Sequence, residues 1–233
     1  MRCVRSISNS TAAVNLQEVC MNRDIDTIAI DLSGILDSVK ENATFDDYFD
    51  IQNYQERKIY IDDEISSYTV DSACRAISRY NREDKGIPTD ERKPIMLYLN
   101  TPGGAVDAGY QLIDLIEVSK TPVYIVNRSD CYSMGFMIFI AGHKRFAYKN
   151  SSFLLHDGSR YAGDSTSKTR DLMEFCDKFD ERVKQTTLDR TNITSEMYDE
   201  KSRVEWYMFA DEAKELGVVD YIIGEDCELD EVI

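Results

Sequence analysis

One serine and one histidine stand where their side chains could do chemistry. Ser133 follows the polar segment "SDCY", which is expected to form a turn between two apolar stretches, and it precedes the predicted helix "MGFMIFIAG". His156, one of two histidines, ends the apolar segment "SFLLH", where a turn begins. A serine needs such a base to become a nucleophile, and α/β folds gather their sites where strands end and helices start. A serine at a helix start is also a common N-cap, so both interpretations stay open.

A glycine pair offers a third component of such a site. "NTPGG" follows the apolar segment "IMLYL" and precedes a helical pattern, so Gly103 and Gly104 are expected in a strand-to-helix turn. Free main-chain N–H groups at a helix start stabilise negative charge, including the oxyanion formed when a serine attacks a carbonyl. Tight packing explains many such glycine pairs equally well. The three segments together supply candidates for a nucleophile, a base and an oxyanion hole.

The elements that would position these residues alternate between strand and helix patterns. Strands are predicted at 58–61, 95–99 and 122–126, and short ones at "RFAY", "SFLLH", "EWYM" and "VVDYII". The strands at 95–99 and 122–126 are almost wholly apolar, which is typical of parallel sheets covered on both faces. Between the first two strands, apolar residues at helical spacing predict a helix around 70–80. The predicted fold class is therefore α/β, with repeated β-α-β units around a parallel sheet.

The second half adds a long helix and two short ones. The long helix is predicted from about Thr166 to Leu188, with an apolar stripe at Leu172, Phe175, Cys176, Phe179 and Val183 and a charged opposite face. The charged face is expected to be solvated or to contact another subunit. Thr194 is predicted to cap a short helix, and Gly217 to end the helix "DEAKEL".

Three regions are predicted along the chain. Residues 1–50 form an N-terminal extension whose structure the sequence does not indicate, residues 51–224 form the α/β domain, and residues 225–233 form an acidic tail that is expected to fray. No apolar run approaches the roughly 18 residues needed to span a bilayer, and the N-terminus lacks a secretory signal pattern. We therefore expect a cytoplasmic protein without a membrane partner.

Charge and cysteine content exclude further classes. With a net charge of −16 the chain has no basic excess to attract phosphate backbones, so nucleic acid is not an expected partner. The six cysteines form no C-x-x-C pair, which predicts reduced, packed thiols rather than a zinc site or disulfides. Cys131 is interpreted in the same way rather than as a nucleophile. His143 is expected at the surface, and the carboxylates of Asp177, Asp180 and Glu181 are expected to be solvated rather than to bind a metal.

Three blocks of the sequence resemble the proteolytic subunit of Clp protease. They are "IMLYLNTPGGAVDAGYQLIDLI", "PVYIVNRSDCYSMGFMIFIAGHKRFAYKNSSFLLHDG" and "WYMFADEAKELGVVDYII", and the similarity runs from about Arg57 to Ile223. The resemblance implies a ClpP-like, crotonase-type fold with a protruding strand-helix handle. It also implies that Ser133 is the nucleophile, that His156 is the general base, and that the N–H groups of Gly104 and Met134 form the oxyanion hole.

The third catalytic position departs from the family pattern. The family has an aspartate where this chain has Glu205, directly before Trp206 and Tyr207. A glutamate can orient an imidazole, although its side chain is one carbon longer. Asp199 is the alternative if a small gap shifts this region.

Other departures surround the site. "SDCY" stands where the family usually has Gly-Gln-Ala-Ala, so Asp130 and Tyr132 introduce a charge and a larger side chain. After His156 the family's Gln-Pro is Asp157-Gly158, and the segment "SRYAGDSTS" keeps Gly163 but has fewer glycines than the family's channel-lining strand. These changes are expected to affect rate and specificity more than fold.

The resemblance implies an ATP-dependent-type serine endopeptidase. It would cut peptides or unfolded proteins inside a homo-oligomeric ring, usually stacked heptamers forming a tetradecamer, with a Clp ATPase as a possible partner and no cofactor. The alternative is a ring subunit or scaffold with impaired catalysis, suggested by Glu205 and by the residues before Ser133. A hydratase or isomerase of the wider crotonase fold is a third possibility, but such enzymes have no use for this serine and histidine.

Overall fold

The computed structural model describes residues 45–158 and 165–233, and Asn53–Ile233 form one compact unit. It is a mixed α/β fold with a seven-stranded sheet. The strands are β1 (Lys58–Ile61), β2 (Ile95–Thr101), β3 (Val123–Tyr132), β4 (Lys144–Tyr148), β5 (Ser152–Leu155), β6 (Trp206–Phe209) and β7 (Tyr221–Ile223). The helices are α3 (Phe45–Glu56), α4 (Ser67–Glu83), α5 (Val106–Val118), α6 (Met134–Ile140), α7 (Thr166–Arg190), α8 (Ser195–Lys201) and α9 (Ala210–Glu215), with short 3-10 turns at Thr89–Glu91 and Leu229–Glu231.

The sheet is parallel except at one pair of strands, which confirms the predicted fold class. The strand order is β1-β2-β3-β4-β7, and β5 pairs with β3 and with β6. Only β5 and β6, among the described strands, run antiparallel to each other. The predicted N-terminal extension, residues 1–50, lies largely outside the described part of the chain, so this region stays a prediction.

Strand β3 is longer than the sequence predicts, and it changes partner along its length. Its first part pairs with β4 from Tyr124 to Asn127, and its last part pairs with β5 from Asp130 to Tyr132. The polar segment before Ser133 is therefore strand and not turn, which corrects the prediction. Polar residues are tolerated there because Arg128 and Ser129 are exposed where the strand passes from one neighbour to the other.

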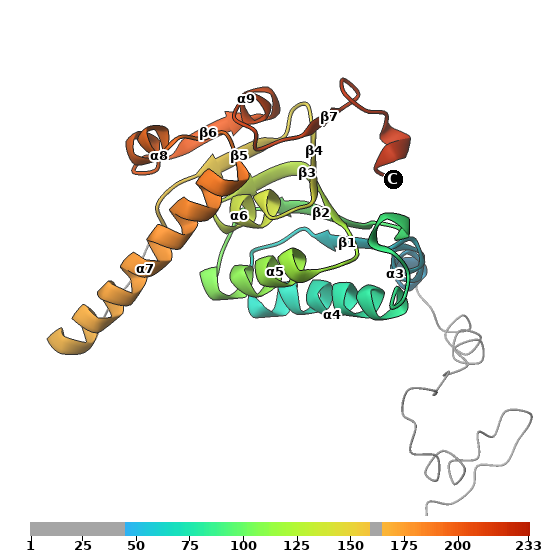
Figure 1. Ribbon diagram of the computed structural model, residues 1–233, viewed down its shortest axis with the longest axis horizontal. Coiled ribbons are helices and arrows are strands. Elements are labelled where there is room, and N and C mark those ends of the chain that lie inside the picture. The colour runs from blue at the N-terminus through green and yellow to red at the C-terminus, as the bar shows by residue number, and fades with distance from the viewer. Residues whose placement is uncertain (1–44, 159–164) are drawn as a thin grey trace, which may run out of the picture. The chain divides into compact units, whose positions relative to one another are not determined.

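Both faces of the central strands are covered, as their apolar sequences predict. Ile95, Leu97 and Leu99 of β2 belong to the larger core, together with buried residues of α4, α5 and α6. Figure 1 shows α4 and α5 side by side along the sheet. Met96 and Tyr98 point to the opposite face and form a second cluster with Phe146 and residues near the C-terminus.

The acidic C-terminal segment packs against this second face, which corrects the expectation that it frays. Val232 is 1% exposed, and its main-chain oxygen accepts a hydrogen bond from the buried Tyr98 hydroxyl group. Cys227 lies in the same cluster. The segment ends in apolar residues that cover sheet surface, and its carboxylates do not prevent this because they remain exposed.

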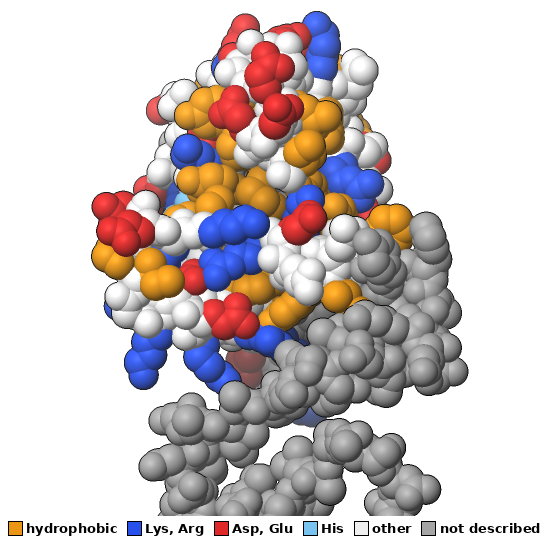
Figure 2. Space-filling view, turned by 90° about the vertical axis from the view of Figure 1, so that its right-hand side faces the viewer, with side chains coloured by type: hydrophobic (Ala, Val, Ile, Leu, Met, Phe, Trp, Pro, Cys, Tyr) orange, Lys and Arg blue, Asp and Glu red, His pale blue; other side chains and the backbone are white. Residues whose placement is uncertain are grey.

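Helix α7 is only partly packed. Its N-terminal half extends away from the sheet (Figure 1), and Leu172, Met173 and Phe175 are exposed there. Val183 and Leu188, nearer its end, pack against the larger core. This arrangement agrees with a protruding helix, while Gly163 and the strand predicted beside it fall on residues 159–164, outside the described part. Figure 2 shows a different face, where hydrophobic side chains are exposed among both basic and acidic ones.

An ion pair connects Arg57, directly before β1, with Asp84, at the C-terminal end of α4. Arg57 donates two hydrogen bonds to the Asp84 carboxylate, at 2.8 and 2.6 Å, and the Thr121 hydroxyl group donates a third at 2.7 Å. The side chain of Asp84 is 4% exposed and that of Arg57 15%. The hydrogen bond from Arg57 is the main cause that lowers the pKa of Asp84 below its ordinary value.

We expect Asp84→Asn to destabilise the protein by about 3 kcal/mol, because it leaves the Arg57 charge buried without a counter-charge. The difference should shrink in acid. A carboxyl group with a lowered pKa stabilises the fold fully above its unfolded pKa of about 3.9 and loses that effect as pH falls through the folded value. Urea denaturation at pH 7 and below pH 4, at one protein concentration, measures both effects.

Asp71→Asn is the matched control. Asp71 pairs with Arg75 at 2.6 Å on the exposed surface of α4, where both side chains are more than half exposed. Such pairs contribute at most about 0.5 kcal/mol. An equal loss in both variants would contradict the structural role assigned to Asp84.

Candidate active site

Ser133 lies in a strained turn between β3 and α6. Its backbone has φ 52° and ψ −117°, a region that residues with a side chain rarely occupy, and its side chain makes no cap hydrogen bond to the helix. The N-cap interpretation is therefore wrong in its hydrogen bonding, although Ser133 does stand at the cap position. The Ser133 N–H donates to Leu154 O of β5 at 2.9 Å. A sharp strand-to-helix turn of this kind presents a serine side chain at the edge of the sheet.

Buried neighbours hold this turn in place. Every residue of α6 is buried, and β3 is paired on the other side. Gly103 approaches the turn so closely that a Cβ atom there would lie 2.6 Å from Tyr132 O and 2.7 Å from Ser133 Cβ. The first glycine of "PGG" is thus required for close approach, and the strain at Ser133 is maintained by packing around it.

We expect Ser133→Gly to be more stable than Ser133→Ala by about 1 kcal/mol. Glycine occupies positive φ without strain, which outweighs its greater entropy in the unfolded chain, whereas alanine keeps the strained Cβ. Neither variant keeps the hydroxyl group, so the difference between their free energies of unfolding reports the backbone strain at position 133. Urea denaturation of the two variants measures it, and equal stability would show that the turn is unstrained in solution.

Two main-chain N–H groups have no acceptor among the described residues: that of Met134, directly after the serine, and that of Gly104, directly after the glycine that touches the serine turn. Ile65 N–H donates to Gly103 O, and Ala105 N–H donates to Ile65 O, both at 2.7 Å, so this bridge bypasses the N–H of Gly104. The N–H of Met134 is the first of α6, where helical N–H groups have no partner within the helix. Gly104 has φ 147°, and a Cβ there would lie 2.3 Å from Ile65 O. In the described part of the chain, both predicted oxyanion donors therefore remain available to donate to a negative charge from outside the fold.

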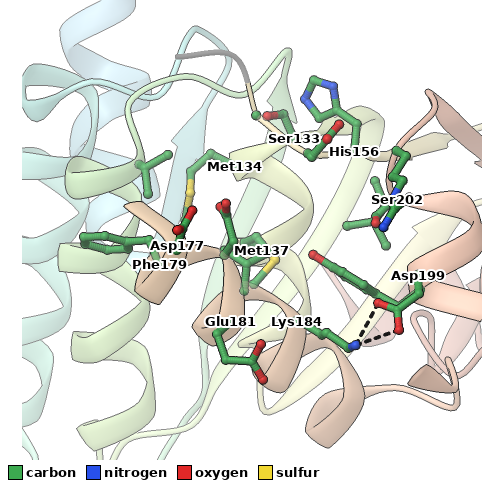
Figure 3. A pocket seen from close by; sticks show the side chains of 18 residues that line it. Ser133, Met134, Met137, His156, Asp177, Phe179, Glu181, Lys184, Asp199 and Ser202 are labelled. Atoms are coloured by element: carbon green, nitrogen blue, oxygen red, sulfur yellow. Dashed lines mark hydrogen bonds and ion pairs between the residues drawn. The ribbon is translucent and has the colours of Figure 1, made fainter. Parts of the chain in front are cut away.

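His156 follows β5, and the pairing of β3 with β5 brings it beside Ser133. Tyr132 is the register partner of Leu154, so the residues after each lie at the same sheet edge. Ser133 and His156 line one pocket of about 460 Å³, and Figure 3 shows them together at one end of it. The His156 Nε2 atom is buried and has no hydrogen-bond partner in the described part of the chain.

Glu205 contacts the other nitrogen of His156. Its Oε1 atom lies 3.1 Å from His156 Nδ1, and its Oε2 atom accepts a hydrogen bond of 2.9 Å from the Tyr207 hydroxyl group. The antiparallel pairing of Leu155 with Trp206 explains the contact, because the next pair in that register is His156 opposite Glu205. A carboxylate only accepts hydrogen bonds, so the contact requires the proton of the imidazole on Nδ1 and leaves Nε2 as an acceptor.

Asp199, the alternative third residue, has another partner. Its carboxylate accepts hydrogen bonds of 2.7 and 2.9 Å from Lys184, which are the main cause of its lowered pKa. Figure 3 shows this ion pair away from Ser133 and His156, although Asp199 lines the same pocket. The structure therefore brings Glu205, and not Asp199, to the imidazole.

The rest of the pocket comes from elements that the sequence did not assign to the site. Its apolar wall includes Met137 of α6, Val183 of α7 and Tyr198 of α8. The apolar stripe of the long helix was the one signal for Val183. Asp177 and Glu181 also line the pocket, and their side chains are exposed as expected. Within the described ranges no group of three or more possible metal ligands occurs.

The remaining candidates behave as ordinary structural residues. Cys131 is fully buried, and burial raises the pKa of its thiol well above the ordinary value, so it is not a reactive thiolate. His143 is exposed, and its Nδ1 atom accepts a hydrogen bond of 3.1 Å from the Val123 N–H.

Among the described helices none is long and apolar enough to cross a membrane.

The fold and the serine turn point to one class of protein. A mostly parallel α/β sheet of seven strands, in which β5 and β6 branch off from β3, is consistent with the ClpP and crotonase type of fold. A family model described as Clp protease matches residues 40–226 of the 233. The chain therefore belongs to the Clp protease family.

Curated relatives agree with this assignment. The chain is 28% identical over 170 residues to "ATP-dependent Clp protease proteolytic subunit 2" of Tropheryma whipplei, covering 72% of this chain and 91% of the relative. It is 27% identical over 186 residues to "ATP-dependent Clp protease proteolytic subunit 1" of Streptomyces avermitilis, covering 78% and 82%. To "ATP-dependent Clp protease proteolytic subunit 2" of Treponema pallidum it is 30% identical over 143 residues, covering 59% and 70%. At this identity the chain is a divergent member.

Proposed function

We propose that this protein is a serine endopeptidase that cuts peptides or unfolded proteins by Ser-His-Glu catalysis. The single observation that carries the proposal is the set of contacts around His156. Its Nδ1 atom contacts Glu205 at 3.1 Å. Its Nε2 atom is buried, has no hydrogen-bond partner among the described residues, and belongs to a side chain that lines the Ser133 pocket. Family membership supports the peptidase class.

In the proposed reaction Ser133 Oγ attacks the scissile carbonyl carbon while His156 Nε2 takes its proton. Glu205 keeps the imidazole in the orientation that leaves Nε2 free and stabilises the imidazolium that forms. The negative charge on the carbonyl oxygen would be held by the N–H groups of Gly104 and Met134, which have no other acceptor among the described residues. The imidazolium then gives its proton to the leaving amine as the C–N bond breaks. In the second half, water attacks the acyl carbon and gives a proton to His156 Nε2, and the imidazolium returns this proton to Ser133 Oγ as the ester bond breaks.

We further propose that the protein works as a homo-oligomeric ring, with heptamers stacked into a tetradecamer. The exposed apolar side chains on the N-terminal half of α7 support contact with further subunits, because Leu172, Met173 and Phe175 are otherwise open to water. The names of the relatives include "ATP-dependent" and "proteolytic subunit", which supports a Clp ATPase as a partner that delivers substrate. A scaffold without catalysis was the alternative, and no contact at the site favours it.

A fluorophosphonate probe on the assembled full-length protein tests the proposal. We expect one covalent adduct per chain, with peptide mapping placing it on Ser133, and hydrolysis of unstructured peptides that stops when labelling is complete. Native mass spectrometry of the same sample gives the number of subunits in the labelled particle. An assembled ring that neither labels nor cleaves peptides would refute the peptidase and leave the scaffold.

A further inference from the structure

The glutamate at position 205 needs a second anchor that an aspartate would not need. Its side chain has one more rotatable bond than aspartate, so holding its carboxylate against an imidazole costs more conformational entropy. The side chain of Glu205 is also 56% exposed, and few neighbours restrict it by packing. Besides His156, its one hydrogen-bond partner among the described residues is the Tyr207 hydroxyl group, at 2.9 Å.

Tyr207 is placed by the strand and by a neighbouring ring. It lies on strand β6, two residues after Glu205, which directly precedes the strand, and its hydroxyl group reaches Glu205 Oε2. Its ring meets the ring of Tyr132 edge to face, with centroids 5.6 Å apart and planes at 84°. Aromatic pairs of this geometry are attractive and fix both rings.

Tyr132 is fixed in turn from β5. Its hydroxyl group is hydrogen-bonded to the Ser152 hydroxyl group at 2.8 Å. The Ser152 hydroxyl group in turn donates a hydrogen bond of 2.9 Å to Asp130 Oδ1. A continuous set of contacts therefore runs from Asp130 through Ser152, Tyr132 and Tyr207 to Glu205. Asp130, Tyr132 and Glu205 are three of the positions where the sequence departs from the family pattern.

We propose that Tyr207 is a positioning residue, whose hydroxyl group holds Glu205 in contact with His156 while Tyr132 holds Tyr207. The three departures from the family pattern then belong together. The longer side chain of Glu205 is held by the Tyr207 hydroxyl group, the Tyr207 ring is held by Tyr132, and Tyr132 is connected through Ser152 to Asp130. The proposal rests on the proposed function insofar as it concerns rate. Its structural part, the fixing of the Glu205–His156 contact, can be tested without catalysis.

Tyr207→Phe in the assembled full-length protein is the test, and Tyr68→Phe, which alters an 89% exposed tyrosine on α4, is its matched control. The second-order rate of fluorophosphonate labelling at Ser133 should fall about three- to tenfold in Tyr207→Phe, because a hydrogen bond to a charged but exposed acceptor is lost. For a peptide substrate the fall should be in kcat, with KM unchanged. Tyr68→Phe should leave all three quantities unchanged.

Imidazole NMR supplies the readout that does not depend on activity. The chain has two histidines, so 15N-histidine labelling with a His143→Gln variant for assignment isolates the signals of His156. The unaltered protein and Tyr68→Phe should show the downfield Nδ1 proton of an imidazole bonded to a carboxylate, and in Tyr207→Phe it should be weakened or lost. If the unaltered protein is not labelled by the probe, the peptidase proposal fails, while this resonance still decides the role of Tyr207.

A double variant separates positioning from general damage. In a Glu205→Gln background there is no carboxylate to orient, so adding Tyr207→Phe should change the labelling rate less than twofold. The proposal is overturned if the His156 resonance persists at full intensity in Tyr207→Phe, or if the rate falls as much in the Glu205→Gln background as in the unaltered protein. Tyr132→Ala, which removes the wall behind Tyr207, should weaken the same resonance, and an unchanged resonance would remove Tyr132 from the proposal.

Discussion

Ser133→Ala is expected to abolish peptide hydrolysis, with a fall in kcat of about 10⁵- to 10⁶-fold, to the level that binding and the oxyanion donors alone provide. Among the described residues that line the pocket, Ser133 is the one hydroxyl residue that stands in a strained turn, directly before the Met134 N–H group. The measurement is steady-state cleavage of a fluorogenic peptide by the assembled protein, together with fluorophosphonate labelling.

Ser129→Ala is the matched control for this variant. Ser129 lies on β3, four residues before Ser133, and it is exposed, with its hydroxyl group near Asp130. Its loss should change kcat less than twofold. Substantial hydrolysis by Ser133→Ala, at more than about one hundredth of the normal rate, would show that the nucleophile is another group.

Glu205→Gln should have the second largest effect, a fall in kcat of about 10²- to 10³-fold with the fold intact. Glutamine keeps the size of the side chain but removes the charge that stabilises the imidazolium, and its amide group can present a donor to Nδ1 and so favour the wrong tautomer. The effect should be smaller than for a fully buried carboxylate, because the side chain of Glu205 is 56% exposed and water partly screens its charge. Comparison of kcat at saturating peptide measures it.

Asp199→Asn distinguishes the two acidic candidates. The Asp199 carboxylate accepts its hydrogen bonds from Lys184 and not from His156 in the described structure, so kcat should change by no more than about threefold. Because Asp199 lines the pocket, KM is free to change in this variant. A larger loss of kcat in Asp199→Asn than in Glu205→Gln would reverse the assignment of the third residue.

Much of the fold was predictable because buried parallel strands and amphipathic helices leave periodic patterns. The apolar residues predicted for the helix around 70–80, such as Val70 and Ile77, are the ones buried in α4, and Thr194 caps α8 by accepting the Met197 N–H. The extent of β3 was not predictable, because its polar end is stabilised by pairing with β5, where Asp130 lies opposite Ser152, and not by local preference. The packing of Val232 was missed for a similar reason, since acidic residues around it masked a short apolar contact.

The sequence predicted which residues lie at the site better than it predicted the side-chain contacts between them. The order of strand, turn and helix predicted where Ser133, His156 and the "PGG" turn would stand. It gave no sign that Asp199 would be bonded to Lys184, because that contact joins two helices through their side chains. Tyr207 was overlooked, although its spacing of two residues from Glu205 on a strand would have placed both on one face.

The docking of the last residues on the sheet has a practical consequence for protein production. Removing residues 225–233 to shorten an apparently dispensable acidic end would uncover Met96, Tyr98 and Phe146, which Cys227 and Val232 now cover. A shortened chain would expose a sticky aromatic surface and should form aggregates during purification, even though its catalytic groups are untouched.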